Sequence, residues 1–246
     1  MKLSHITAQW PTYETYTTFN FTVPDNFIRV AICTPTAGSV KASYCTSLLA
    51  MSVHFLATPL EDEPELQRAI THDVLIGASI SQAREDMVDG AIKAGDVTHV
   101  LFIDDDMGFE QDALTLAIER GQPIVIANYR QKTPPWKFTA RYQDSGGAWH
   151  ECKTTKDTSG LEEVGFGGFG FALFEIEVLK ALKRPRFLVR FNEEHQRYTT
   201  EDVPFFAACR EAGYKVWVDH ALSKKVYHIG DFSFNWTSSP IRSAPE

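Results

Sequence analysis

The sequence predicts an α/β protein in which helices flank a mostly parallel sheet. Short apolar runs alternate with segments of helical periodicity across residues 27–127, and this alternation implies crossover connections that leave successive strands parallel. The clearest run, residues 98–104, is apolar until it ends in carboxylates, as a buried strand does where it leaves a sheet. Turn-forming residues such as Pro35 and Gly38 separate the runs.

Each element of the first half has its own signal. Residues 27–33 are rich in apolar and β-branched side chains and stop at a turn-forming stretch, which indicates the first strand. Apolar residues recur at spacings of four and three from Tyr44 to Phe55 and so predict a helix. The same two patterns predict strands over residues 73–77, 98–104 and 123–127, and helices over residues 40–55, 81–94 and 110–120.

The alternation stops after residue 130. A hairpin is expected over residues 137–149, around a Gly-Gly turn. Residues 165–170 form a glycine–phenylalanine loop that leads into an apolar run, and residues 183–198 are polar and unpatterned, which predicts a mobile loop. The second half is therefore expected to add a smaller mixed sheet. Its other expected elements are helices over residues 175–182 and 201–211 and a strand over residues 214–218.

Composition limits the classes of protein that this chain can be. The 246 residues are 43% hydrophobic and include 17 Phe, which supplies a core and excludes intrinsic disorder. No apolar run approaches the roughly 18 residues that span a membrane, and no signal-like apolar core follows the amino terminus. No repeat or linker divides the chain, so we expect a single domain over residues 1–246, with halves at about 27–130 and 131–246.

The four cysteines, at positions 33, 45, 152 and 209, show no short paired spacing. A zinc site or redox motif of the usual kind contains two close thiols, so the spacing supports neither. Reduced thiols in a chain of this length are typical of the cytosol, and a cytoplasmic location is expected.

Charge is distributed unevenly along the chain. The net charge of −8 argues against a protein that coats nucleic acid. Residues 1–120 contain 7 basic and 17 acidic side chains, whereas residues 121–246 contain 17 basic and 15 acidic ones. Basic residues gather in two stretches, 130–141 and 180–190, which predict either a solvated surface or a local groove for an acidic partner.

Asp104, Asp105 and Asp106 follow the strongest strand directly. Three adjacent carboxylates repel one another, so a fold that gathers them favours a neutralising cation. Because side chains alternate at a strand end, Asp104 and Asp106 are expected on the same side. Oxygen ligands suit hard cations such as Mg²⁺ or Mn²⁺, and open α/β sheets bind ligands at the carboxyl ends of their strands. A solvated loop or a helix cap is the alternative.

Residues 100–109, VLFIDDDMGF, resemble the acidic strand-end motif of metal-dependent, nucleotide-sugar-using glycosyltransferases with the GT-A fold. Residues 30–36 resemble the first strand and donor loop of that fold. Residues 81–84, Ser-Gln-Ala-Arg, resemble an arginine segment of its family 2-like branch, with Glu85 where phage and bacterial members often have Asn. The glycine loop, Glu201-Asp202 and residues 228–230 follow in the family's order, so the resemblance spans about residues 28–230.

The resemblance implies a function and a set of site residues. It implies transfer of a sugar from a nucleotide diphosphate sugar, with a UDP-sugar as the expected donor, to an acceptor hydroxyl. Mn²⁺ or Mg²⁺ is the implied cofactor, because a divalent cation stabilises charge on the leaving diphosphate. Considered alone, His228 is more typical of a core or surface histidine than of a metal ligand, and its place in the family's order supports the ligand role. Arg84 is equally a partner in an ion pair on the helix surface. The implied metal ligands are Asp104, Asp106 and His228, and the implied donor-binding residues are Thr34, Pro35, Thr36, Arg84 and Asp105.

The acceptor hydroxyl must lose a proton as it attacks, which a nearby carboxylate promotes as a general base. Asp202 is the expected base and Glu201 is the second candidate. Both also suit the start of the helix that they open, where acidic side chains favour the helix dipole. If the transfer retains the anomeric configuration, Asp202 has another role.

The second half is expected to bind the acceptor. A glycine loop lets backbone approach a ligand closely, and an aromatic ring can stack on a sugar or base. Tight turns and ordinary packing are the alternatives. Hydroxymethylated pyrimidine in phage DNA, flipped into the site beside a basic stretch, is one expected acceptor, and a saccharide or small molecule is the other. The acceptor-binding candidates are Gly168, Phe169, Trp136 and Arg130.

Two other classes of protein share parts of this pattern. A nucleotidyltransferase would use a similar sheet and similar carboxylates, but it normally has a basic residue in the loop after the first strand, and residues 34–38 contain none. A non-catalytic binding module would keep the pocket without needing both Asp202 and the metal ligands.

Overall fold

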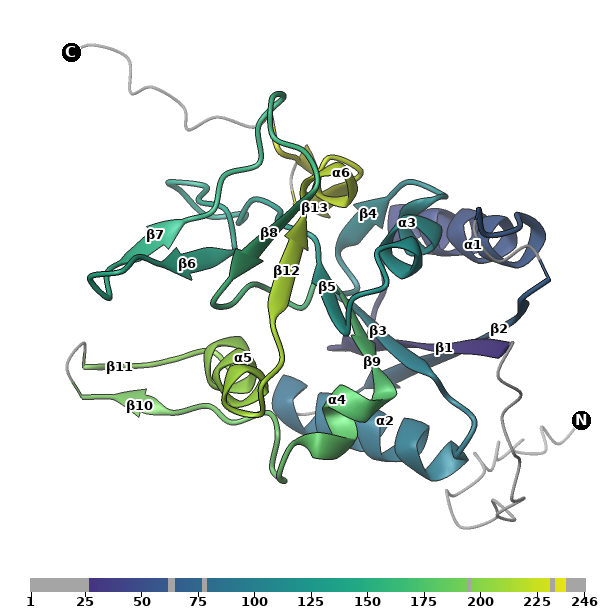
Figure 1. Ribbon diagram of the computed structural model, residues 1–246, viewed down its shortest axis with the longest axis horizontal. Coiled ribbons are helices and arrows are strands. Elements are labelled where there is room, and N and C mark those ends of the chain that lie inside the picture. Colours follow the sequence, from purple (N-terminus) through teal and green to yellow (C-terminus); the bar gives the residue numbers. More distant parts are fainter. Residues whose placement is uncertain (1–26, 62–64, 77–78, 194–195, 231–232, 238–246) are drawn as a thin grey trace, which may run out of the picture.

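The computed structural model describes residues 27–61, 65–76, 79–193, 196–230 and 233–237. A seven-stranded sheet runs through this part of the chain, in the order β2-β1-β3-β9-β5-β12-β8 (Figure 1). Its strands are β1 (Phe27–Thr36), β2 (Gln67–Ile76), β3 (His99–Ile103), β5 (Ile124–Ile126), β8 (Leu161–Val164), β9 (Phe171–Glu175) and β12 (Val216–Asp219).

The sheet is mixed, with most strands parallel as predicted. β1 is parallel to β2 and β3, and β5 is parallel to β12. β9 lies between β3 and β5 and is antiparallel to both, and β8 is antiparallel to β12. β9 coincides with the apolar run after the glycine loop. Phe171 to Phe174 are all buried, so the run lacks the alternation that marks a half-exposed strand.

Helices cover both faces of the sheet (Figure 1). Val30 of β1 belongs to the same hydrophobic cluster as Met51 of α1, whereas Ala31 belongs to the cluster that contains Val88 of α2. Successive strand residues point to opposite faces, so one strand supplies both cores. One face carries α1 (Ala42–Ala57), α3 (Ala113–Glu119) and α6 (His220–Ser223), and the other carries α2 (Ile80–Ala94), α4 (Ile176–Ala181) and α5 (Asp202–Glu211).

The helices predicted from periodicity all form, within three residues of the expected bounds. The largest shift is at α3, which begins at Ala113 because the chain first forms β4 (Met107–Phe109). β4 pairs antiparallel with β13 (Val226–Ile229), with His228 opposite Met107. This pairing was not predicted, and it brings His228 beside the acidic segment.

The smaller sheets differ in part from expectation. The predicted hairpin forms from β6 (Arg141–Gln143) and β7 (Trp149–Glu151). Instead of one mixed sheet, the described residues form separate antiparallel sheets, including β14 (Ser233–Phe234) beside β13. The predicted mobile loop contains an antiparallel pair, β10 (Phe191–Asn192) and β11 (Arg197–Tyr198).

β2 is longer than the expected strand over residues 73–77, and Gly77 lies outside the described residues. β2 is an edge strand whose side chains are all at least partly exposed, so it lacks the apolar signal of a buried strand. No helix in the described part of the chain is long and apolar enough to cross a membrane.

Candidate functional site

A cavity of about 370 Å³ opens at the carboxyl ends of β1 and β3. This is the edge at which open α/β sheets bind ligands. The helix α2 closes one side through Ile80 and Ala83. Six predicted site residues line this cavity together: Pro35, Thr36, Asp104, Asp105, Asp106 and His228.

Asp106 lies in a charged group at the cavity. One of its oxygens pairs with Lys132 Nζ, and the other lies 3.3 Å from His228 Nε2. Ile229 N donates to Asp106 O at 2.7 Å, which holds β13 beside the acidic segment. Burial alone would raise the pKa of the Asp106 carboxyl, but hydrogen bonds from His228 and Lys132 lower that pKa to about 2. Asp106 is therefore ionised at neutral pH.

Asp104 faces a different cation. Arg84 Nη2 donates to Asp104 Oδ1 at 2.7 Å, and Arg84 Nη1 pairs with Glu201. The Arg84 guanidinium is buried and lies 4.4 Å from the centre of the Phe169 ring. Burial raises the pKa of Asp104, and the charge of Arg84 opposes that rise. Arg84 thus positions two carboxylates from opposite halves of the chain.

The donor-loop threonines occupy different places. Thr36 and Pro35 line the cavity, and Thr36 Oγ1 accepts from Gly38 N at 3.2 Å. Thr34 is fully buried, where its hydroxyl bonds to Tyr44 and lies 3.3 Å from His72 Nε2. Thr34 therefore supports the loop, and its hydroxyl is already bonded within the protein.

Glu201 and Asp202 lie where α5 starts, in different environments. Glu201 is buried and bound by Arg84. Asp202 Oδ1 accepts from Val203 N at 2.9 Å and pairs with the Thr200 hydroxyl. Burial raises the pKa of Asp202, and the hydrogen bond from Thr200 opposes the rise. Because a base works best when its pKa is near the operating pH, Asp202 has the more suitable environment.

The aromatic acceptor candidates are enclosed. Phe169 is 2% exposed and stacks on Phe206 with ring centres 5.4 Å apart. Trp136 is 7% exposed, and its carbonyl accepts from Arg130 Nη1 at 2.9 Å. The Arg130 guanidinium lies 4.0 Å over the ring of Phe138. These side chains pack against the protein, and none of them lines the cavity described above.

Gly168 has a structural reason to be glycine. A Cβ at Gly168 would collide with the Tyr129 hydroxyl, and Gly170 N donates to that hydroxyl at 2.8 Å. The Tyr129 ring in turn meets the His228 ring edge-on, with centres 5.3 Å apart. The glycine loop therefore makes room for the tyrosine that positions His228. Burial raises the pKa of Tyr129, with further contributions from Asp104 and Asp202, so both carboxylates lie near this phenol.

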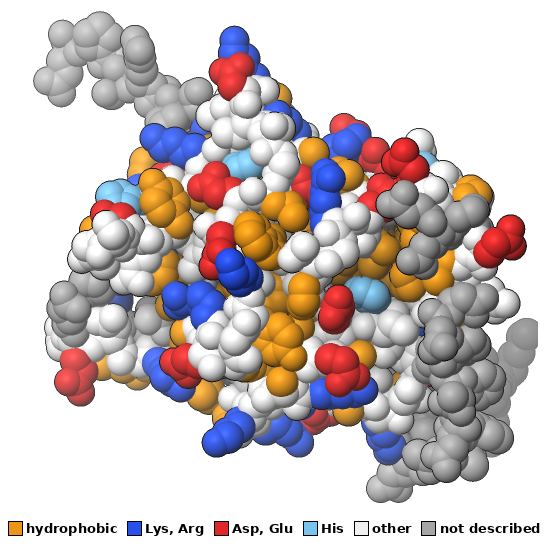
Figure 2. Space-filling view, in the orientation of Figure 1, with side chains coloured by type: hydrophobic (Ala, Val, Ile, Leu, Met, Phe, Trp, Pro, Cys, Tyr) orange, Lys and Arg blue, Asp and Glu red, His pale blue; other side chains and the backbone are white. Residues whose placement is uncertain are grey.

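The basic stretches are largely engaged within the protein. Arg186 Nη1 lies 2.7 Å from Glu85 and 3.0 Å from Asp89, and Arg184 also pairs with both acids. Glu85, which stands where the resembling family often has Asn, is thus a buried acceptor for the 184–186 segment. On the face shown in Figure 2, acidic and basic side chains are interspersed.

The donor set at the cavity fits a divalent cation in its chemistry. Asp106 is ionised, and His228 Nε2 lies 3.3 Å from it. Asp104 and Asp105 present further carboxylate oxygens at the cavity, farther apart than in a preformed three-ligand site. Lys132 pairs with Asp106 and supplies the positive charge that a cation would provide. This lysine was recognised from sequence only as part of a basic stretch, because its partner lies 26 positions away.

Replacing Lys132 with Met should raise the affinity of the protein for Mn²⁺ by about fivefold, because a partly exposed ion pair that competes with the cation contributes up to ~1 kcal/mol. Calorimetric titration with Mn²⁺ in the absence of nucleotide measures this change. Lys215→Met, which breaks an exposed pair with Glu163 elsewhere, should leave the affinity unchanged. Weaker Mn²⁺ binding by Lys132→Met would contradict the competition.

Comparisons with known proteins establish the fold. No protein-family model and no curated protein matches the chain. Among solved structures, A197 from STIV has a TM-score of 0.52 and 19% identity, over 89% of this chain and 99% of A197. GalNAc-T7, crystallised with UDP, GalNAc and Mn²⁺, has a TM-score of 0.50 and 12% identity, over 84% of this chain and 45% of that one.

A nucleoside-diphosphate-sugar pyrophosphorylase from Vibrio cholerae RC9 has a lower TM-score of 0.46 and 13% identity, over 82% of this chain and 96% of that one. At the identities of A197 and GalNAc-T7, structural similarity shows the fold alone. The chain therefore has an α/β fold of the GT-A type, with a mixed seven-stranded sheet flanked by helices.

Proposed function

We propose that this protein is a glycosyltransferase that uses Mn²⁺ or Mg²⁺ and moves a sugar from a nucleotide diphosphate sugar to an acceptor hydroxyl. A UDP-sugar is the donor that we propose first. The observation that carries the proposal is the cavity in which three aspartates and His228 meet Pro35 and Thr36 at the carboxyl edge of the sheet. Its volume of about 370 Å³ lies within the range of small-molecule sites.

Each residue has a role that follows from its surroundings. Asp104, Asp106 and His228 would hold the cation, which when bound stabilises negative charge on the departing diphosphate. Thr36, at the end of β1, and Asp105, just after β3, would contact the nucleotide. Residues 27–130 would form the donor half of a single domain, and residues 131–246 the acceptor half.

Two further residues would handle charge and protons. Lys132, once displaced from Asp106, would offer its ammonium to phosphate oxygens as a point charge. Asp202 would accept the proton of the acceptor hydroxyl, because it is a carboxylate with a raised pKa and Glu201 is held by Arg84.

The choice of acceptor depends on whether the basic side chains are free to bind a phosphate backbone. Arg184 and Arg186 are paired with Glu85 and Asp89, so their charges are largely neutralised before any phosphate backbone approaches. We therefore place a saccharide or small molecule first, and hydroxymethylated pyrimidine in DNA second.

A screen of nucleotide sugars with Mn²⁺ tests this proposal through release of the nucleotide. Parallel reactions contain hydroxymethylated DNA, unmodified DNA or a panel of saccharides. Release from a UDP-sugar that one acceptor stimulates is the expected result. Release of pyrophosphate from a nucleoside triphosphate and a sugar phosphate would instead identify a nucleotidyltransferase, and binding without turnover of any donor would identify a binding module.

Replacing Asp202 with Asn should lower kcat by about 10²-fold, since a general base typically contributes 10²–10⁴. The base acts in its ionised form, so kcat/KM of the wild type should rise with pH through the raised pKa of Asp202. This rise of kcat/KM on the acid side of the pH profile, the acid limb, should disappear in Asp202→Asn. A limb that persists in Asp202→Asn but vanishes in Glu201→Gln would assign the base to Glu201.

A further inference from the structure

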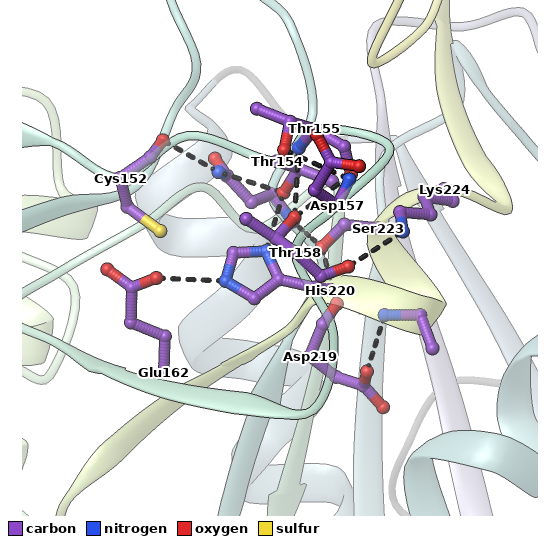
Figure 3. Close-up of polar contacts among 12 residues, drawn as sticks. Cys152, Thr154, Thr155, Asp157, Thr158, Glu162, Asp219, His220, Ser223 and Lys224 are labelled. Carbon is purple, nitrogen blue, oxygen red and sulfur yellow. Dashed lines mark hydrogen bonds and ion pairs between the residues drawn. The ribbon is translucent and has the colours of Figure 1, made fainter.

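A second group of potential ligands lies among residues that do not line the cavity. Cys152, Glu162 and His220 each direct one ligand atom to a common point, and these three atoms lie within 4.8 Å of one another (Figure 3). Cys152 follows β7, Glu162 lies in β8 and His220 opens α6. In the described part of the chain, this is the one set of three such residues gathered so closely.

Hydrogen bonds and strand pairing hold all three ligand residues in place. Cys152 N donates to Ala140 O at 3.1 Å, and Cys152 O accepts from Asn128 Nδ2 at 2.9 Å. Glu162 sits opposite Val218 in the paired strands β8 and β12. His220 N donates to Gly160 O at 3.0 Å. The three positions are therefore set by the folded backbone and need no ion to bring them together.

The side chain of His220 is also oriented. Its Nδ1 lies 3.0 Å from Thr154 Oγ1, and its Nε2 lies 2.9 Å from Glu162 Oε2. Histidines that bind metals usually hold the other ring nitrogen in such a hydrogen bond. Cys152 is fully buried and His220 is 2% exposed, whereas the Glu162 side chain is 41% exposed. Cys152 and His220 are therefore shielded from solvent, and solvent reaches the group at Glu162.

We propose that Cys152, Glu162 and His220 form a Zn²⁺ site whose fourth position is taken by water. A thiolate, an imidazole and a carboxylate are all established zinc ligands, and three protein ligands with one open position is a common zinc arrangement. Ligand atoms at about 2.0–2.3 Å from zinc lie roughly 3–4 Å from one another, so a small closure of the observed group completes the site.

The sulfur distinguishes this site from the cavity. The hard cations expected at Asp104 and Asp106 prefer oxygen, whereas Cys152 selects a softer metal. The zinc site is independent of the proposed glycosyl transfer, since its residues follow β7 or lie in β8 and α6, and none of them lines the cavity. Its structural effect would be to clamp these three elements of the second half to one another.

Zinc binding has a chemical consequence at the thiol. Burial, followed by the charge of Glu162, raises the pKa of Cys152 to about 12. The thiol is therefore protonated in the metal-free protein. Because zinc binds the thiolate, uptake of the metal must release this proton to solvent.

Titration of the metal-free protein with Co²⁺ tests the site, since a thiolate ligand gives cobalt a charge-transfer band in the near ultraviolet. The expected result is one such band that saturates at one Co²⁺ per chain and is reversed by Zn²⁺. Cys152→Ser should abolish the band. Cys45→Ser, which removes an exposed thiol, and Asp106→Asn, which alters the other site, should both keep it.

Glu162→Gln keeps the test decisive if Cys152→Ser does not fold, because the Glu162 side chain is partly exposed and the amide preserves its shape. This variant should bind Zn²⁺ at least about tenfold more weakly than the wild type. Loss of a hydrogen bond to a metal ligand typically lowers metal affinity by that factor, and loss of the ligand itself should lower it no less. At a hundredfold excess of free Zn²⁺ over its Kd, the melting temperature of the wild type should rise by roughly 5–10 °C.

Three results would overturn the site. They are the absence of a thiolate band in the wild type, a band that Cys152→Ser retains, and equal zinc affinity in Glu162→Gln and the wild type. Any of these would leave the hydrogen bond between His220 and Glu162, beside a buried thiol, as a contact that joins α6 to β8 without a metal.

Discussion

Replacement of Asp106 with Asn should lower the turnover of the nucleotide sugar by about 10³-fold. The cation proposed at Asp106 would contribute several kcal/mol to stabilisation of the leaving diphosphate, and each ~1.4 kcal/mol corresponds to a tenfold change in rate. Asp106 is suited to this role because its pKa is lowered to about 2, so that its carboxylate is charged at neutral pH. Initial rates of nucleotide release at saturating Mn²⁺ measure the effect.

Asp157→Asn is the matched control for this experiment. Asp157 is exposed in a loop of the second half, and the same loss of charge there should leave turnover within twofold of the wild type. The Mn²⁺ affinity of Asp106→Asn should fall together with its turnover. Wild-type turnover by Asp106→Asn would show that the aspartate cluster does not hold a catalytic cation.

Replacement of Arg84 with Met should lower the free energy of unfolding by about 3–5 kcal/mol, as typically follows when one partner of a buried ion pair is removed. The Arg84 side chain is 2% exposed and pairs with Glu201 and Asp104. Without the guanidinium, Glu201 would remain as an unpaired charge in a largely buried position. Urea unfolding of the variant and the wild type measures the difference.

Two further variants separate charge burial from general damage. Arg184→Met removes an arginine that is also paired, with Glu85 and Asp89, but is 59% exposed. That change should cost about 1 kcal/mol or less. Adding Glu201→Gln to Arg84→Met should restore part of the lost stability, because the unpaired charge is removed. Equal losses at Arg84 and Arg184 would contradict the assignment of a buried pair.

Several features of the fold could be predicted from sequence because their signals are local. Helix α1 follows from apolar residues at spacings of three and four, and β3 follows from a short apolar run. The placement of Asp104 to Asp106 at a cavity followed from one further rule, that ligands meet the carboxyl ends of parallel strands. β9 was described only as an apolar run, because a short apolar run by itself does not distinguish a buried strand from a buried helical segment.

The proposed zinc site shows where spacing rules mislead. The sequence contains no two close thiols, yet the fold brings one cysteine together with a glutamate and a histidine from separate segments. Cys152, 68 positions from His220 in the sequence, is held there by hydrogen bonds to Ala140 and Asn128. Glu162 and His220 meet because β8 pairs with β12 at the sheet edge. No local pattern records that pairing.

The sequence alone determined the alternating strands and helices of the first half and the acidic end of β3, because backbone propensity and side-chain periodicity act over a few residues. The tertiary structure decided how the charges are paired: His228 and Lys132 at Asp106, and Arg84 between Asp104 and Glu201. Those contacts depend on strand order and register. They form between segments that are far apart in the chain. Burial then determines how much folding free energy would be lost if one of these charges were left unpaired.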